Sequence, residues 1–168
     1  SKPKMDKIAP IHPSVSLHLG ECCEYVKTLT PNTIHMIYLD PPFNSDRNYT
    51  MGVDSTIGFG DKWTDETYEQ FLESTISSLY TVLTKDGTLF FHISAACMFI
   101  PEKVLRKHFS IVTPIFWKKC RSKNNVKNKL GATIDIIFKC NKQAKHKFNV
   151  VTQEKDATYL KNSFKNSD

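Results

Sequence analysis

The sequence lacks any run of about 18 consecutive apolar residues, which a membrane-spanning helix requires, and it has no charged segment followed by an apolar one at its start. Neither a membrane span nor a secretory signal is therefore predicted. Internal repeats and low-complexity tracts are also missing. These absences favour an intracellular protein, cytoplasmic in a prokaryote or a virus and nuclear in a eukaryote.

Cysteine is scarce and never has the CxxC spacing. The five cysteines are Cys22, Cys23, Cys97, Cys120 and Cys140. An odd number without this spacing argues against a zinc site and against a framework of disulfides. We therefore expect reduced, structural thiols and no bound metal.

Acidic residues are absent from one strongly basic segment of the chain. This basic segment contains Lys118, Lys119, Arg121, Lys123, Lys127 and Lys129. A local cluster of this kind is typical of a surface that binds a polyanion such as DNA, and equally of a solvated loop. The net charge of +6 adds little by itself, because basic surfaces are common.

The 168 residues, 40% of them apolar, suit one domain with a real core. Residues 1–13 are polar and proline-punctuated, which predicts a poorly ordered tail. Alternation predicts a short strand at 14–19, and helical spacing predicts a helix at 21–29. The almost wholly apolar segment 33–39 is typical of a strand that is buried on both faces of a parallel sheet.

A loop is expected over 41–62. Beyond it, the pattern predicts a long helix from Thr64 to about residue 84 and a buried strand over 88–94. A short helix at 101–109 and strands at 110–119 and 132–140 complete the order. This alternation indicates an α/β domain with a mostly parallel sheet, ending in an antiparallel pair.

The stretch HMIYLDPPFNSDRNY, residues 35–49, places an acid and two prolines directly after the apolar strand. Ligands of open α/β sheets bind outside the carboxyl ends of strands, where Asp40-Pro41-Pro42-Phe43 lies. A carboxylate, carbonyls without competing N–H donors and a flat aromatic face would suit a planar ring that carries an amino group. The alternative is an ordinary strand that ends in a proline turn, with Asp40 as a cap.

The motif and its surroundings resemble the amino-group DNA methyltransferases, which modify adenine N6 or cytosine N4 and carry D/N/S-P-P-Y/F/W after a strand. The resemblance extends over LHLGECCEYVKTLTPNTIHMIYLDPPFN, residues 17–44, and later segments follow the β-class order to the end of the chain. It implies a Rossmann-like, S-adenosylmethionine-dependent methyltransferase fold. It also implies a DNA partner, and it favours phosphate contact by the basic segment.

The resemblance implies a catalytic site formed by Asp40, Pro41, Pro42 and Phe43. Asp40 and the Pro41 carbonyl would accept the amino N–H bonds of a flipped base, on which Phe43 would stack. Glu21 and Asp40 would contact S-adenosylmethionine, although Glu21 could equally cap the helix that follows it. Adenine is favoured, because cytosine-modifying relatives usually begin the motif with serine.

The sequence departs from the family in lacking the glycine-rich F-x-G-x-G turn after a strand. Residues 58–60, Gly-Phe-Gly, have no strand ahead of them and are interpreted as a loop. We therefore expect the catalytic half of a longer enzyme, with 14–144 as the catalytic part and 145–168 as the start of a target-recognition region. Alternatively, a dimer or a second chain supplies the missing turn, and either arrangement predicts an exposed sheet edge.

Three further residues have an ordinary structural interpretation. His92, near the end of a buried strand, is expected to be a satisfied core histidine. Trp63 is expected to be a hydrophobic staple at the start of the long helix. Asp135 aligns with an acid of the family, but Ile134 stands where the family has a histidine. Because the glycine-rich turn is missing, a catalytically inactive, nucleic-acid-binding scaffold subunit remains the competing class, beside cytosine N4 methylation.

Overall fold

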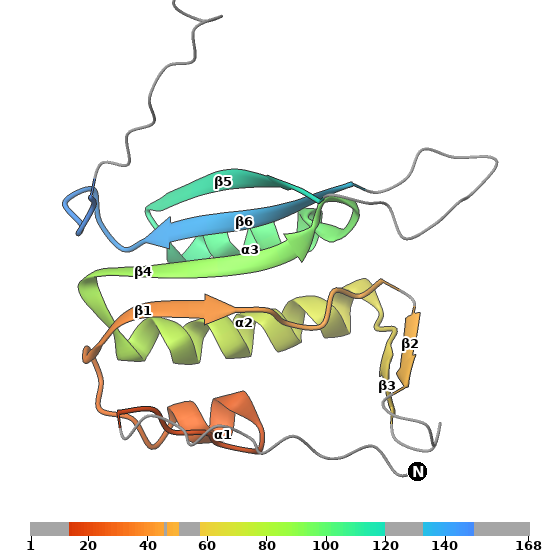
Figure 1. Ribbon diagram of the computed structural model, residues 1–168, viewed down its shortest axis with the longest axis horizontal. Helices are drawn as coiled ribbons and strands as arrows, with labels where there is room; N and C mark the ends of the chain where they lie inside the picture. The colour runs from red at the N-terminus through yellow and green to blue at the C-terminus, as the bar shows by residue number, and fades with distance from the viewer. Residues whose placement is uncertain (1–13, 46, 51–57, 120–132, 150–168) are drawn as a thin grey trace, which may run out of the picture.

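The computed structural model describes residues 14–45, 47–50, 58–119 and 133–149, and forms a sheet with helices on one side (Figure 1). The helices are α1 (Cys22–Val26), α2 (Asp65–Val82) and α3 (Phe99–His108), with a 3-10 turn η1 (Ala95–Cys97). The strands are β1 (Ile34–Leu39), β2 (Arg47–Thr50), β3 (Gly58–Asp61), β4 (Leu83–Ser94), β5 (Ile111–Lys118) and β6 (Ile134–Asn141).

The main sheet has four strands in the order β1-β4-β6-β5. β1 and β4 are parallel, because α2 carries the chain back between them, whereas β6 is antiparallel to both β4 and β5. The α/β class and the antiparallel pair at the end are thus confirmed. The sheet is mixed rather than mostly parallel, since β6 lies between β4 and β5 and reverses two of the three ladders.

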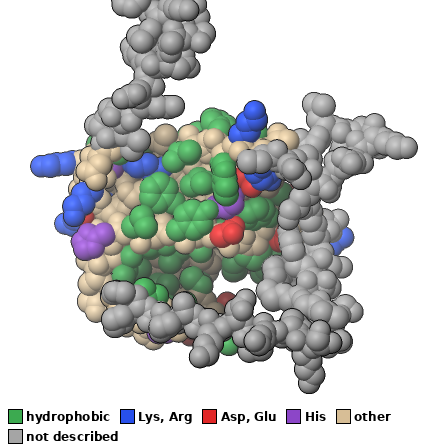
Figure 2. All heavy atoms as spheres, in the orientation of Figure 1, with side chains coloured by type: hydrophobic (Ala, Val, Ile, Leu, Met, Phe, Trp, Pro, Cys, Tyr) green, Lys and Arg blue, Asp and Glu red, His purple; other side chains and the backbone are tan. Residues whose placement is uncertain are grey.

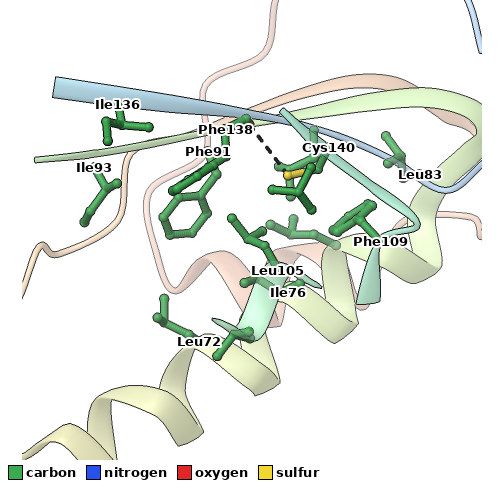
Figure 3. Packing of buried hydrophobic residues seen from close by; sticks show 14 of the residues in the cluster. Leu72, Ile76, Leu83, Phe91, Ile93, Leu105, Phe109, Ile136, Phe138 and Cys140 are labelled. Carbon is green, nitrogen blue, oxygen red and sulfur yellow. Dashed lines mark hydrogen bonds between the residues drawn. The ribbon is translucent and has the colours of Figure 1, made fainter. Parts of the chain in front are cut away.

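The core lies between the sheet and the helices α2 and α3 (Figure 3). Alternate residues of β4, namely Leu89, Phe91 and Ile93, are fully buried and point toward this layer. Ile136 and Phe138 of β6 continue it across the sheet. Each such side chain contributes about 1.5–3 kcal/mol by leaving water, so this layer holds the strands in register.

The opposite face of the sheet is open. Met36 and Tyr38 of β1 are 65% and 53% exposed, and Trp117 of β5 is 48% exposed. Hydrophobic side chains gather on this face in Figure 2. The prediction that 33–39 is buried on both faces is therefore wrong for this chain, because β1 is an edge strand and the described helices cover one face. Among the described strands, β1 lies at one edge of the sheet.

The segment 14–19 forms no strand, although its residues alternate. Val15, Leu17 and Leu19 are all more than half exposed. A strand is stable only when a neighbour pairs with its N–H and C=O groups, and the described residues offer this segment no such neighbour. The helix predicted over 21–29 is also shorter, since α1 ends at Val26.

The long helix begins as predicted. Thr64 is its N-cap and accepts a hydrogen bond from the backbone N–H of Thr67 at 3.2 Å. The helix ends earlier than expected, because Leu83 already pairs with Ile34 as the first residue of β4. The predicted loop at 41–62 also contains the antiparallel pair β2 and β3, whose glycines hid the strand pattern.

The strand predicted over 88–94 begins five residues earlier, at Leu83, whereas the boundaries predicted at 33–39, 101–109, 110–119 and 132–140 agree to within about two residues, the usual uncertainty of element ends. Within the described ranges, no helix is both long and apolar enough to cross a membrane. The predicted tail at 1–13 and most of the predicted target-recognition region lie outside the described residues.

Candidate active site

Asp40 follows the last residue of β1 at the carboxyl end of the strand. Its side chain is 58% exposed, whereas the next residue, Pro41, is buried. β4 runs parallel to β1 and brings its own carboxyl end to the same edge of the sheet. The edge therefore presents an open carboxylate on a rigid backbone.

Tyr68 of α2 supports the turn formed by Pro41 and Pro42. Its hydroxyl donates a 2.7 Å hydrogen bond to the carbonyl of Pro42, and its ring is almost fully buried in α2. Burial, followed by the nearby charges of Asp61 and Cys97, raises the pKa of Tyr68, so the hydroxyl remains a donor at neutral pH. The Pro41 carbonyl accepts no hydrogen bond from the described part of the chain.

Asp61 holds the segment that follows the motif. Its carboxylate is completely buried and accepts hydrogen bonds from the backbone N–H of Asn44 at 2.7 Å and of Ser45 at 2.9 Å. The Ser45 hydroxyl donates a third, at 2.5 Å. Asn44 has a left-handed backbone with φ of 54°, a conformation that asparagine tolerates better than most residues. The turn out of the motif is thus held by a buried anion.

Trp63 has the role that its position predicts. Its ring packs against Tyr68 and Phe71 at centroid distances of 6.3 and 5.0 Å, and its backbone N–H donates to the side-chain oxygen of Asn44 at 2.8 Å. The residue before an N-cap contacts the fourth helical residue here, which is a hydrophobic staple. Trp63 therefore couples the start of α2 to the motif.

His92 lies beside Asp40 on the open face of the sheet. Its Nδ1 is 3.1 Å from the Tyr38 hydroxyl and 3.5 Å from an Asp40 carboxylate oxygen. Its Nε2 is 3.3 Å from Asp135. The ring is 9% exposed and fully hydrogen-bonded, as predicted for a satisfied histidine, but it belongs to the site.

Asp135 connects this histidine to the basic segment. Its buried carboxylate also accepts a 2.7 Å hydrogen bond from the Lys119 ammonium, while Lys118 is exposed. Of the six predicted DNA-binding residues, the structure describes these two lysines only. The other four, Arg121, Lys123, Lys127 and Lys129, lie outside the described residues.

Phe43 lies between His92 and a pocket. Its ring meets the edge of His92 at a centroid distance of 5.6 Å and an interplanar angle of 72°. On the side of α2 and α3, Phe43 and Asn44 line a pocket of about 240 Å³ with Asp65 and Cys97. The aromatic face predicted for the site is therefore present, partly buried and braced by another ring.

Glu21 occupies the N-cap position of α1, but its side chain makes no capping hydrogen bond and is exposed. The capping interpretation of its carboxylate is therefore not observed. α1 packs below β1 and α2 in Figure 1, with Val26 in the core and Cys23 Sγ 3.5 Å from the Thr75 hydroxyl. The four described cysteines are free thiols.

Sequence reasoning missed the supporting residues. Asp61 was an ordinary acid in a predicted loop, and Tyr68 was one member of an apolar helix face. Both act over long sequence separations, 17 and 26 residues from their partners Asn44 and Pro42. The one available signal was a tyrosine on an otherwise apolar helix face, since Asp61 is followed directly by Lys62 and looks like an ordinary surface acid.

This arrangement can accept hydrogen bonds and stack a ring, and it needs no covalent nucleophile. A carboxylate and a backbone carbonyl stand at the mouth of a strand, with a phenyl ring after them. Acceptors of this kind bind and polarise N–H groups. Within the described residues, no group of His, Cys, Asp and Glu could hold a metal ion.

Two curated proteins have similar sequences. The chain is 26% identical over 136 residues to the type II methyltransferase M.EcaI of Enterobacter cloacae, and 24% identical over 127 residues to the DNA adenine methyltransferase YhdJ of Escherichia coli K12. These alignments cover 79% and 76% of this chain but only 30% and 41% of the relatives. The chain thus spans less than half the length of the curated relatives it matches.

Solved structures share the fold. The cytosine-N4-specific PvuII DNA methyltransferase aligns with a TM-score of 0.56 and 13% identity, over 88% of this chain and 61% of that one. TTHA0409 of Thermus thermophilus, assigned as a DNA modification methylase and complexed with S-adenosyl-L-methionine, aligns with a TM-score of 0.51 and 13% identity, over 79% and 55%. At these identities the likeness establishes the fold.

One family model covers most of the chain. The model for the DNA methylases that act at N6 or N4 positions matches residues 34–168, from the start of β1 onward. The match includes Asp40, the motif and the supporting residues Asp61, Tyr68, His92 and Asp135. The chain belongs to the N6/N4 DNA methylase family.

Proposed function

We propose that this chain carries the base-binding half of an S-adenosylmethionine-dependent DNA methyltransferase that modifies an exocyclic amino group, with adenine N6 as the favoured target. The observation that supports this most strongly is the open carboxylate of Asp40 at the carboxyl end of β1, on a turn held by Tyr68 and Asp61. A turn that merely ended a strand would not require two buried polar supports.

Asp40 and Pro41 are the acceptors for the amino group. The lone pair of a base amino nitrogen is delocalised into the ring, so the nitrogen is a poor nucleophile. When the Asp40 carboxylate and the Pro41 carbonyl accept its two N–H bonds, the nitrogen can become pyramidal and positive charge can develop on it beside the carboxylate. Tyr68 occupies the Pro42 carbonyl, which leaves the Pro41 carbonyl for the substrate.

Phe43 is the stacking residue for the flipped base. A base inside duplex DNA cannot reach Asp40, so it must leave the helix at a cost of a few kcal/mol. Stacking on an aromatic ring returns about 1–3 kcal/mol per base. The edge contact of Phe43 with His92 leaves the ring braced against tilting when a base arrives.

S-adenosylmethionine supplies the methyl group and, when bound, an electrophilic carbon for the amino nitrogen. The residues of this chain fit the acceptor side of such a site, because Asp40 is open at the strand end and the exposed carboxylate of Glu21 is not engaged as a cap. They do not include the glycine-rich F-x-G-x-G turn. Glu21 and Asp40 are therefore proposed as its contacts within this half.

The missing turn requires a second contributor, either the rest of a longer protein or another chain. The edge position of β1 and the exposure of Met36 and Tyr38 favour this, since apolar strands are normally covered. We propose that the contributor pairs with β1 and brings the cofactor to Asp40. Co-purification of a dimer or a heteromeric complex with methyltransferase activity would test this.

The basic segment is the proposed DNA contact. Lys118 is exposed beside the site, and the basic segment that begins with it contains six lysine and arginine residues and no acid, which favours contact with phosphates. Each phosphate contact lowers the logarithmic salt slope of DNA affinity by about 0.9. Replacing Lys118, Arg121 and Lys123 with glutamine removes such contacts and should make this slope less negative. An unchanged affinity and slope would contradict the assignment.

The decisive experiment is nucleoside mass spectrometry of DNA from cells that express the full-length protein, beside the variant Asp40→Asn. The matched control is Asp86→Asn, at the opposite end of β4. N6-methyladenine that disappears only in Asp40→Asn supports the reaction, the base and the residue. N4-methylcytosine with the same dependence keeps the mechanism and changes the base.

The other outcomes also discriminate. Methylation that survives Asp40→Asn would place the chemistry elsewhere. The absence of any methylated base, from the full-length protein with its partners present, would favour an inactive nucleic-acid-binding scaffold. The lack of the glycine-rich turn in this chain is the observation that keeps this second function in consideration.

A further inference from the structure

A chain of ionisable groups runs inward from Asp40. His92 bridges two carboxylates, with Asp40 near Nδ1 at 3.5 Å and Asp135 near Nε2 at 3.3 Å. Lys119 closes the chain through its 2.7 Å contact with Asp135. Figure 2 shows a histidine between acidic side chains within the hydrophobic patch of the open face. Nothing in the proposed reaction has so far used this arrangement.

The contacts determine where the proton of the neutral imidazole lies. Asp135 is paired with Lys119 and can only accept, so Nε2 carries the hydrogen and donates it. Nδ1 then has a lone pair. The Tyr38 hydroxyl donates to it, because burial and the charges of Asp40 and Asp135 raise the pKa of Tyr38 and keep this group protonated.

The Asp40 carboxylate and His92 Nδ1 consequently face each other as two hydrogen-bond acceptors. Two acceptors 3.5 Å apart repel each other weakly, and a proton between them would convert this repulsion into a hydrogen bond. A proton could thus be held between Asp40 and His92 Nδ1, next to the carboxylate that would face the substrate. Among the described residues, the side chains that face this ring are Tyr38, Asp40, Phe43, Trp117 and Asp135.

We propose that His92 is a positioning residue that receives, through Asp40, the proton released by the methylated amino group. This inference rests on the proposed function. An N–H bond of the amino nitrogen breaks and an O–H bond forms on Asp40. The Tyr38 hydroxyl rotates away from His92 Nδ1 and frees its lone pair, and the O–H bond on Asp40 then breaks as an N–H bond forms on Nδ1, which leaves Asp40 as a carboxylate and His92 as an imidazolium.

Asp135 stabilises the imidazolium, because a cation is held between two carboxylates while Lys119 balances the second of them. The relay is needed only while a base and the cofactor cover Asp40, since water then cannot take the proton. Once the product leaves, the exposed Asp40 and the hydroxyl of Tyr38, itself on an exposed residue, connect the ring to solvent. The imidazole then loses its proton and the cycle can restart.

The test uses the full-length methyltransferase with His92→Gln, Asp135→Asn and the control His108→Gln, which removes the histidine at the end of α3, paired with Glu73 of α2. We expect His92→Gln to lower kcat about 100-fold, within the usual range for a proton-transfer group, with the KM for DNA unchanged. Added imidazole should restore part of the rate of His92→Ala, and His108→Gln should keep the wild-type rate. If the glutamine variant fails to fold, Asp135→Asn, which keeps the shape of the side chain but has one acceptor oxygen in place of the two that bind His92 and Lys119, should lower kcat at least about tenfold.

A second measurement, which does not depend on methyltransferase activity, accompanies the kinetic comparison. Nitrogen-15 NMR should show that the neutral His92 ring carries its hydrogen on Nε2 and none on Nδ1, and Asp135→Asn should relax this preference. Unchanged kcat in folded His92→Gln and Asp135→Asn, or an Nδ1–H tautomer, overturns the relay. Loss of activity in Asp40→Asn with full activity in the His92 variants overturns the relay alone, whereas an inactive wild-type protein overturns the proposed function with it.

Discussion

The Tyr68 hydroxyl on α2 donates a 2.7 Å hydrogen bond to the carbonyl of Pro42, 26 residues earlier in the chain. This contact ties the helix that packs under the sheet to the turn that carries the proposed catalytic carboxylate. Its donor is a buried hydroxyl, and its acceptor is the carbonyl of the proline that is not proposed to bind the substrate. Packing in the core is thereby transmitted to the geometry of the site.

Tyr68→Phe removes this hydrogen bond and keeps the ring. Because the Pro42 carbonyl then has no partner in a half-buried turn, we expect the free energy of unfolding to fall by about 1–2 kcal/mol. Methyl transfer should slow more than binding, since Asp40 loses its fixed position. Tyr80→Phe is the matched control on the same helix and should leave both quantities unchanged. Urea denaturation and steady-state kinetics measure them, and equal behaviour of the two variants would contradict the role.

Asp61→Ala removes a buried anion with three hydrogen bonds. The N–H groups of Asn44 and Ser45 lose their acceptor, and the left-handed turn at Asn44 loses its support. Hydrogen bonds to charged groups contribute about 1.5–3 kcal/mol each, less the cost of burying the carboxylate, so we expect a loss of about 2–4 kcal/mol. Asp86→Ala is the control. Thermal and urea unfolding report the change, and a loss no larger than that of the control would refute it.

The buried thiol of Cys140 should make the folded protein less stable in alkaline solution. Burial raises the pKa of its thiol from 9.0 to about 12, with smaller opposing effects of Arg106 and Lys139. A raised pKa in the folded state means that the stabilisation is complete below pH 9 and is lost as the pH rises toward about 12, by an amount on the order of 4 kcal/mol. Cys140→Ala should therefore flatten the decline of unfolding free energy above pH 9.

The control for this pH experiment is Val112→Ala, directly across the ladder from Cys140. It removes comparable packing and keeps the thiol, so its unfolding free energy should be lower at every pH with the wild-type slope. Tyr68 contributes alkaline sensitivity of the same sign, because its pKa is also raised. A Cys140→Ala profile parallel to that of the wild type would show that the thiol does not control the slope.

Met36→Glu tests the open face. Met36 is 65% exposed on an apolar edge strand, so a charge there should cost little stability and should reduce self-association of the 168-residue chain. Ser77→Glu, on the exposed side of α2, introduces the same charge where no apolar patch exists. Sedimentation velocity measures the association. Equal self-association of the wild type and both variants would indicate that this face of the sheet does not contribute to self-association.

Much of the fold could be predicted because it depends on local patterns. The long helix follows from its apolar spacing and the Thr64 cap, and the strand that ends at Asp40 follows from its apolar run. The prediction failed where partners decide the outcome. Residues 14–19 alternate like a strand but find no pairing neighbour among the described residues, and Leu83 joins β4 because Ile34 is across from it.

The sequence by itself determined the α/β order and the motif Asp40-Pro41-Pro42-Phe43 at a strand end, since both follow from the periodicity of apolar residues and the chemistry of adjacent ones. Only the tertiary structure decided which distant groups meet there. Asp61, Tyr68, His92 and Asp135 are separated by 16 to 54 residues of chain from the partners with which they form these contacts. Their roles depend on strand order and register, because a side chain becomes a partner only when packing places it within hydrogen-bond distance.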